Sequence, residues 1–340
     1  MKRTTLRGAA SILAVVALAI TATAPAHAAD RGLYGTSDPQ YDGVLRQSLA
    51  IMGLTSVGVT PQRPAVTWLL EQQCADGSFE SYRADTNTPC AASDAANFTG
   101  PDVNSTAAAA TALALAGEQK AARSAVVWLN AAQNDDWGWP YYPGGASDAN
   151  STALAILALR SVSPQDRSAR VPNAIAYLGS LQIPCTAANG GALPYQAGGA
   201  ANSLASSEAI ASIASRLPLE KAESLTRNPR CAKGVPTRLA SYLAGQISAK
   251  GALTSDLGTG QDLGSTARAL VGLSELGVGK AAVRTGLRTL QSSAREYALK
   301  DGVARPGALG LLLMVAETTG TSPRAFGGVN LVSTLTGSMQ

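Results

Sequence analysis

Carboxylate side chains recur in this sequence at one kind of position, directly before runs of small residues. The runs read DVNST from Asp102, DANST from Asp148 and DLGST from Asp262, and Glu208 lies within a similar run. These carboxylates could supply the acid and base pair of a carbohydrate-active enzyme. Asp, Asn and Ser also cap helices, because their oxygens accept the free N–H groups of a first helical turn. We favour capping.

Histidine chemistry is excluded for the exported chain. The sequence contains one histidine, His27, and it falls within the predicted N-terminal leader. Without an imidazole, Ser-His-Asp catalysis, Cys-His catalysis and histidine metal sites cannot be assembled. Carboxylates, Tyr, Lys, Cys or a carboxylate-bound metal remain as possible catalysts. We expect neither a cofactor nor a metal site.

Residues 1–28 read as a signal peptide, because MKRTTLRG is basic, SILAVVALAI is apolar and APAHA ends in a cleavage pattern. A protein secreted after cleavage near Ala28 follows, with an uncleaved membrane anchor as the alternative. No later segment approaches the roughly 18 apolar residues of a membrane span. The leader holds three of the 27 Lys and Arg residues, so 24 basic residues face 23 acidic ones in the mature chain. This balance gives no footprint for nucleic acid.

Cysteine number and export together predict disulfides. Cys74, Cys90, Cys185 and Cys231 are four thiols in a chain bound for an oxidising compartment. Neighbours along the sequence suggest Cys74 with Cys90 and Cys185 with Cys231, although three pairings are possible. Closing the first loop would stabilise the fold by about 3 kcal/mol. A cysteine nucleophile is disfavoured because none has an imidazole partner.

An internal repeat of two helices organises the chain. One helix ends in aromatic-Leu-x3-Gln, as in TWLLEQQ up to Gln73, VWLNAAQ up to Gln133 and AYLGSLQ up to Gln182, and a polar turn follows each glutamine. The other helix is the small-residue run described above. Six helices of the first kind are expected at 62–73, 120–133, 169–182, 234–246, 279–291 and about 322–336. Six of the second kind alternate with them, beginning near Tyr41, and no strand is predicted.

Residue size predicts how these helices are arranged. Helices rich in Ala and Leu can pack inside, where there is least room, and helices bearing Arg and Trp outside. The pattern therefore predicts two concentric rings in an all-α, single-domain chain. The repeat domain should span residues 41–340, after an N-terminal extension at residues 29–40.

The repeat resembles the QW motif of the squalene-cyclase and protein-prenyltransferase family. The matching positions are Arg63, Trp68, Leu69, Gln73, Gly77 and Phe79, then Arg123, Trp128, Leu129, Gln133, Gly138 and Trp139. The resemblance covers residues 41–340 and is strongest in the first three units. It implies an (α/α)6 toroid of six inner and six outer helices, a fold shared with cobalamin carriers and complement thioester domains.

The residues that carry out the chemistry of that family are missing from this sequence. Its cyclases protonate substrate with the middle acid of an Asp-x-Asp-Asp-Thr-Ala run, and the matching positions are Asn104, Asn150 and Gly264. An amide cannot deliver a proton to an alkene as a buried carboxylic acid can. The family's prenyltransferases need a histidine for zinc, and the thioester motif Gly-Cys-Gly-Glu-Gln is absent. We therefore expect no inherited catalysis.

The remaining candidate is a rim, where the turns and the starts of the inner helices should meet. We predict ligand contacts there from two groups of side chains. The aromatic group is Phe79, Trp137, Trp139, Tyr141, Tyr142 and Tyr195, with Tyr82 and Phe98 nearby, and the polar group is Asp102, Asn104, Asp148, Asn150 and Asp262. This combination suits a ligand with a flat or apolar body and polar edges.

The sequence thus predicts an exported, non-catalytic toroid that binds a small ligand or a surface partner at its rim. The resemblance makes a corrinoid the first ligand to consider and an isoprenoid lipid the second. The alternatives are a terpenoid-cyclase or prenyltransferase-like enzyme, a carbohydrate-active enzyme using the inner carboxylates, and a scaffold for a cell-surface protein.

Overall fold

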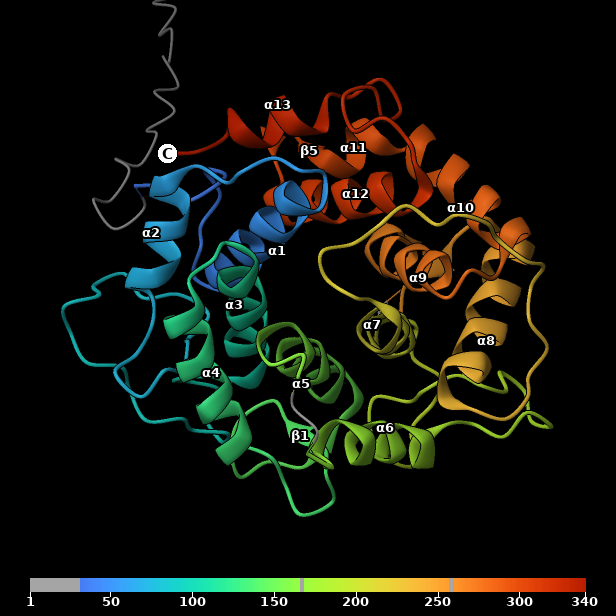
Figure 1. Ribbon diagram of the computed structural model, residues 1–340, viewed down its shortest axis with the longest axis horizontal. Coiled ribbons are helices and arrows are strands. Elements are labelled where there is room, and N and C mark those ends of the chain that lie inside the picture. The colour runs from blue at the N-terminus through green and yellow to red at the C-terminus, as the bar shows by residue number, and fades with distance from the viewer. Residues whose placement is uncertain (1–30, 166–167, 257, 259) are drawn as a thin grey trace, which may run out of the picture.

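The computed structural model describes residues 31–340, apart from residues 166–167, 257 and 259. The predicted leader lies outside the described residues. The described chain is mostly helical, as expected, and Figure 1 shows its helices in two concentric rings. The inner ring holds α1 (Gly43–Ser56), α3 (Val103–Leu115), α5 (Ala149–Val162), α7 (Ser203–Ala214), α9 (Leu263–Glu275) and α12 (Pro306–Thr319). The outer ring holds α2 (Arg63–Glu71), α4 (Gln119–Ala131), α6 (Arg170–Leu181), α8 (Val235–Lys250), α10 (Lys280–Ser292) and α13 (Leu331–Thr336).

Small residues let the inner helices close into a ring. Each inner helix packs against the next, and α12 packs back against α1. A Cβ atom added to Gly310 of α12 would lie 2.1 Å from the carbonyl oxygen of Leu49 in α1. A Cβ on Gly53 of α1 would lie 2.5 Å from the carbonyl oxygen of Gly310. Only glycine permits this backbone contact.

The repeated glutamine joins one outer helix to the next. The side-chain amide of Gln73 donates to the carbonyl of Gly77, in its own turn, at 3.0 Å and to that of Ala121, in α4, at 2.9 Å. Gln182 makes the equivalent pair of bonds to Gly191 and Val235, each at 3.1 Å. The QW glutamine is therefore a structural joint between repeats.

Two expectations about the elements are wrong. The last outer helix, expected from about residue 322, is only α13, because Gly327 and Gly328 adopt left-handed φ angles in the turn before it. Short antiparallel hairpins, not predicted, also occur among the described residues: β1 (Trp139–Pro140) with β2 (Ser147–Asp148), β3 (Leu253–Thr254) with β4 (Gln261–Asp262), and β5 (Leu299–Lys300) with β6 (Val303–Ala304). Each hairpin leads into the start of an inner helix. A short helix, α11 (Ala294–Ala298), precedes β5.

Both ends of the described chain meet beside α1. The N–H of Gly32 donates to the carbonyl of Gln340, and the N–H of Gln340 donates to the carbonyl of Leu33, both at 2.9 Å. Buried Gln47 of α1 accepts from the N–H of Tyr34 and donates to the carbonyls of Gly32 and Ala65. No helix within the described residues is long and apolar enough to cross a membrane.

Both predicted disulfides are confirmed. Cys74 bonds Cys90, and Cys185 bonds Cys231. The second bond anchors the 215–233 segment, which arches from α7 past α12 and α10 before reaching α8 (Figure 1). Within this segment, the N–H of Ala222 donates to the carbonyl of Thr318 at the end of α12. The segment therefore crosses the ends of inner helices.

The close contact of Gly310 with α1 predicts that a larger residue at this position destabilises the fold. Gly310→Ala should lower the free energy of unfolding by about 3 kcal/mol or more, because the new methyl group meets backbone that no rotamer change can move. Gly245→Ala in α8 is the control, since nothing lies within 4 Å of its added Cβ, and it should stabilise by about 0.5–1 kcal/mol. Urea unfolding measures both variants. Equal effects would contradict the proposed packing constraint.

Candidate functional site

The three aspartates singled out in the sequence cap inner helices. Asp102 accepts hydrogen bonds from the N–H and the hydroxyl of Ser105, both at 2.7 Å. Asp148 and Ser151 repeat this geometry at 2.8 and 2.9 Å, as does Asp262 with the serine three residues later. Asp102 and Asp148 are each 1% exposed. Their oxygens hold the first turns of α3 and α5.

Burial also changes the protonation of these caps. Removal from water raises the pKa of Asp102 from 3.8 to about 6, and its hydrogen bonds to Ser105 offset part of that rise. Burial raises the pKa of Asp148 in the same way, against the bonds from Ser151. Burial therefore shifts the pKa of both carboxyls in the same direction, upward.

Two predicted rim aromatics are instead core residues. Phe79 and Trp139 are both fully buried. The backbone N–H of each donates to a threonine hydroxyl on the following inner helix, Thr106 at 3.0 Å and Thr152 at 2.9 Å. These bonds hold each turn against the next inner helix, and the Trp139 indole N–H donates to the Leu129 carbonyl in α4 at 2.7 Å. The prediction that these two rings lie exposed at the rim is therefore wrong.

Four of the other predicted aromatics form a partly exposed cluster, which we call the tyrosine face: Phe98, Tyr141, Tyr142 and Tyr195. The rings of Tyr141 and Tyr142 meet edge to face at 4.8 Å, and Phe98 contacts Tyr142 at 6.2 Å. Tyr141 is 36% exposed, Tyr195 43% and Phe98 74%, whereas Tyr142 is mostly buried. Trp137 is also exposed.

Backbone bonds hold the two half-exposed tyrosines in equivalent places. The carbonyl of Tyr141 accepts from the N–H of Val103, at the start of α3, and the carbonyl of Tyr195 accepts from the N–H of Ala149, at the start of α5. Both distances are 2.9 Å. Burial and the Asp148 carboxylate, to which the Tyr195 hydroxyl donates a hydrogen bond, raise the pKa of Tyr195 to about 12.

A buried polar layer made by Asn150, Glu208 and Arg268 lies inside the inner ring. No role for Arg268 was predicted from the sequence. The side-chain amide of Asn150 donates to Glu208 at 2.9 Å, and Glu208 pairs with Arg268 of α9 at 3.3 Å. The oxygen atoms of Asn104 and Asn150 are buried without a hydrogen-bond partner among the described residues. Burial raises the pKa of Glu208, while Arg268 and Asn150 act to lower it. Arg268 carried one signal in the sequence, since it is a lone basic residue within a small-residue helix.

The central cavity beneath this layer is small and apolar. Glu208 and Arg268 stand six residues after their helix caps, and the residues at the same position of other inner helices also line the cavity: Ala108, Leu154 and Leu311. Leu217 and Leu219 of the 215–233 segment complete its wall. Its volume is about 70 Å³. Pockets for drug-sized ligands measure about 300–1,000 Å³, so this space suits only very small molecules.

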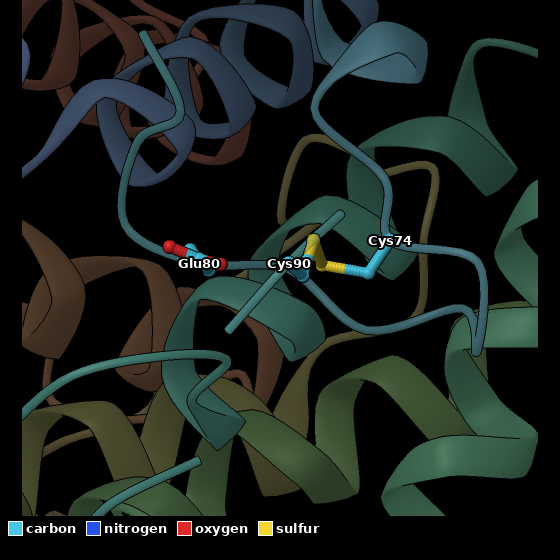
Figure 2. A group of neighbouring side chains, drawn as sticks. All are labelled: Cys74, Glu80 and Cys90. Atoms are coloured by element: carbon cyan, nitrogen blue, oxygen red, sulfur yellow. A yellow bond between two sulfur atoms is a disulfide. The ribbon is translucent and has the colours of Figure 1, made fainter. Parts of the chain in front are cut away.

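One group of side chains has the composition of a metal site but not its chemistry. Ligand atoms of Cys74, Glu80 and Cys90 lie within 4.8 Å of one another. Figure 2 shows the two sulfur atoms joined in a disulfide beside Glu80. A disulfide has no thiolate to offer a metal. Glu80 accepts from the N–H of Ala91 at 3.1 Å, so it holds the disulfide loop.

Comparisons with known proteins identify the fold and nothing finer. No protein-family model matches the chain, and no curated protein matches it. The type II terpene cyclase MstE from Scytonema, in complex with geranylgeranyl dihydroxybenzoate, is 16% identical with a TM-score of 0.54, over 85% of this chain and 79% of the cyclase. The ligand-free cyclase is 18% identical with a TM-score of 0.53, over 86% and 79%. A polysaccharide lyase is 12% identical with a TM-score of 0.52, over 82% and 89%. The chain thus shares the toroid fold of both enzyme classes.

The buried cap at Asp102 predicts a pH dependence. The folded-state pKa lies above the unfolded value of 3.8, so the folded chain binds the proton more tightly. Stability should therefore fall as pH rises from about 4 to about 7, with Asp102 contributing on the order of 2 kcal/mol of that fall. Asp102→Asn keeps the cap oxygen and should remove this contribution. Urea unfolding across this pH range measures the difference.

The control for that experiment is Asp85→Asn. Asp85 is exposed, and hydrogen bonds from Asn87 and Thr88 lower its pKa, so its own contribution has the opposite sign. Parallel stability curves for the wild type and Asp102→Asn would contradict the assignment.

Proposed function

We propose that this chain is an exported, non-catalytic toroid that binds a small ligand on the tyrosine face. Its support is the placement of Tyr141 and Tyr195. The two rings are partly exposed and held over adjacent inner-helix starts by equivalent backbone bonds. Tyrosine combines a rigid apolar ring with a polar hydroxyl, so a pair of them can contact both the body and the edge of a ligand.

Backbone strain on the same face supports a binding role. Phe98 has a φ angle of +55°, in the left-handed region that glycine adopts without cost. A non-glycine residue there costs roughly 1–2 kcal/mol, and Phe98 is 74% exposed, so burial of its ring offsets little of that cost. Trp137 repeats this combination, with a φ angle of +69° and an exposed side chain. Strain at exposed aromatic residues is expected where the side chain serves binding.

The interior does not favour an enzyme of the cyclase type. A cavity of about 70 Å³ holds neither an isoprenoid chain nor a corrinoid. Either ligand would therefore bind at the rim, where the inner helices begin. The carbohydrate-active alternative is weakened because Asp102, Asp148 and Asp262 each accept two cap bonds. Glu208 is paired with Arg268.

Native mass spectrometry of the mature protein from its own producing cells tests this function, because a retained ligand adds mass. Cobalamin is the first defined probe, measured by co-elution and a spectral shift. A protein of unmodified mass that takes up no small molecule and captures another protein on this face would replace the proposal with the scaffold alternative.

Phe98→Gly gives a sharper test, because it should separate stability from binding. It relieves the left-handed strain, so the free energy of unfolding should stay within about 1 kcal/mol of the wild type or rise. Ligand binding should weaken at least tenfold, as it should in Tyr195→Ala. Val127→Ser, at an exposed position on outer helix α4, is the control and should bind normally. Unchanged binding in both tyrosine-face variants would refute the proposal.

A further inference from the structure

A recess lies at the starts of inner helices α9 and α12, beside α11. Its volume is about 700 Å³. Its polar lining includes Gln261, Asp262, Ser293, Glu296, Tyr297 and Arg305. None of these residues belongs to the tyrosine face, so this recess is a separate place to look for a ligand.

Gly264 opens a polar cradle at this recess. The repeat-equivalent positions in α3 and α5 carry Asn104 and Asn150, whereas α9 has no side chain there. A Cβ added to Gly264 would lie 3.2 Å from the Tyr297 hydroxyl and 3.3 Å from Nη1 of Arg268. It would also lie 3.4 Å from Oδ1 of Asp262. Polar atoms from three side chains therefore converge beside a bare backbone.

Neighbouring residues hold Arg268 and Tyr297 in place, and both side chains can still donate hydrogen bonds to a ligand. Arg268 is fixed through its Nε atom by Glu208 at 3.3 Å, and its Nη atoms are further N–H donors. The Arg305 guanidinium lies 5.5 Å from the centre of the Tyr297 ring and donates to the Tyr297 carbonyl. The tyrosine is thereby held at the edge of the recess.

The donor and acceptor pattern identifies the ligand chemistry. Arg268 and Tyr297 offer N–H and O–H donors. Asp262 Oδ1 already accepts the cap bond from the Ser265 N–H, and its second lone pair can accept a bond from a ligand. A ligand hydroxyl, which donates once and accepts twice, matches this set. The two guanidinium groups of Arg268 and Arg305 are balanced by the carboxylates of Glu208, Asp262 and Glu296, so an anion gains no excess positive charge.

We propose that the Gly264 cradle and its recess bind a sugar residue, with one ring hydroxyl held between Arg268, Tyr297 and Asp262. A sugar is neutral and carries several adjacent hydroxyls, and the serine, glutamine and glutamate side chains of the recess can pair with the others. A volume of about 700 Å³ accommodates one or more rings. This inference goes beyond the proposed function, since it uses no residue of the tyrosine face.

The test titrates the mature full-length protein with methyl glycosides of glucose, galactose, mannose and N-acetylglucosamine, observed by saturation-transfer NMR and calorimetry. The wild type should bind at least one of them. Gly264→Ala should weaken that binding tenfold or more, because its methyl group lies among the three polar atoms. Tyr297→Phe keeps the ring and its contact with Arg305 but loses the hydroxyl, and it should weaken binding similarly.

The matched control is Gly307→Ala. Gly307 occupies the equivalent position in α12, and its added Cβ would meet only ordinary contacts, the nearest at 3.5 Å from Leu49. This variant should bind like the wild type. Alanine is a better helix former than glycine, so neither alanine variant should lose the fold. Thermal unfolding verifies this.

Three results would overturn the inference. They are no glycoside binding to the wild type, binding that survives both Gly264→Ala and Tyr297→Phe, and displacement of the glycoside by millimolar acetate or phosphate, which would indicate an anion site. If Phe98→Gly abolishes glycoside binding and Gly264→Ala does not, the sugar binds on the tyrosine face. That outcome would overturn the cradle while supporting the proposed function.

Discussion

Backbone contact between neighbouring inner helices is the constraint on which the rest of the structure depends. A ring around one axis leaves little room inside, and α1 meets α12 where Gly53 faces Gly310. Gly272 of α9 meets Ile210 of α7 in the same way, since an added Cβ would lie 2.7 Å from the isoleucine side chain. Helices that approach this closely leave a central cavity of about 70 Å³.

Because the interior is nearly filled, ligand contacts are expected at the mouth of the ring, which is the rim where the inner helices begin. The helix starts there need caps, and buried Asp102 and Asp148 supply them while fixing the first turns. The turns bound to those helices then present Tyr141 and Tyr195 outward. The mouth thus combines rigid helix starts with variable turns, an arrangement in which function can change without disturbing the scaffold.

The repeat made most of the helices and the capping carboxylates predictable, because both depend on short spacings. The order of the cysteines along the chain suggested the two disulfide pairings, with the other pairings left open. Contacts between helices of different repeats were harder to predict from the sequence. Glu208 and Arg268 lie far apart in sequence, and only the packing of α7 on α9 brings them together. Aromatic residues in turns were ambiguous as well, since Trp139 and Tyr141 are two residues apart and one is buried while the other is exposed. The bonds of threonine hydroxyls to the turn backbone decide between these outcomes.

The central claim is that ligand recognition occurs at the mouth and not within the ring. A crystal structure of the mature protein, purified from its producing cells with any ligand it retains, tests this most directly. The account predicts ligand density against the tyrosine face or the Gly264 cradle, with nothing larger than water in the central cavity. Elongated ligand density along the ring axis, between Leu154 and Leu311, would contradict it.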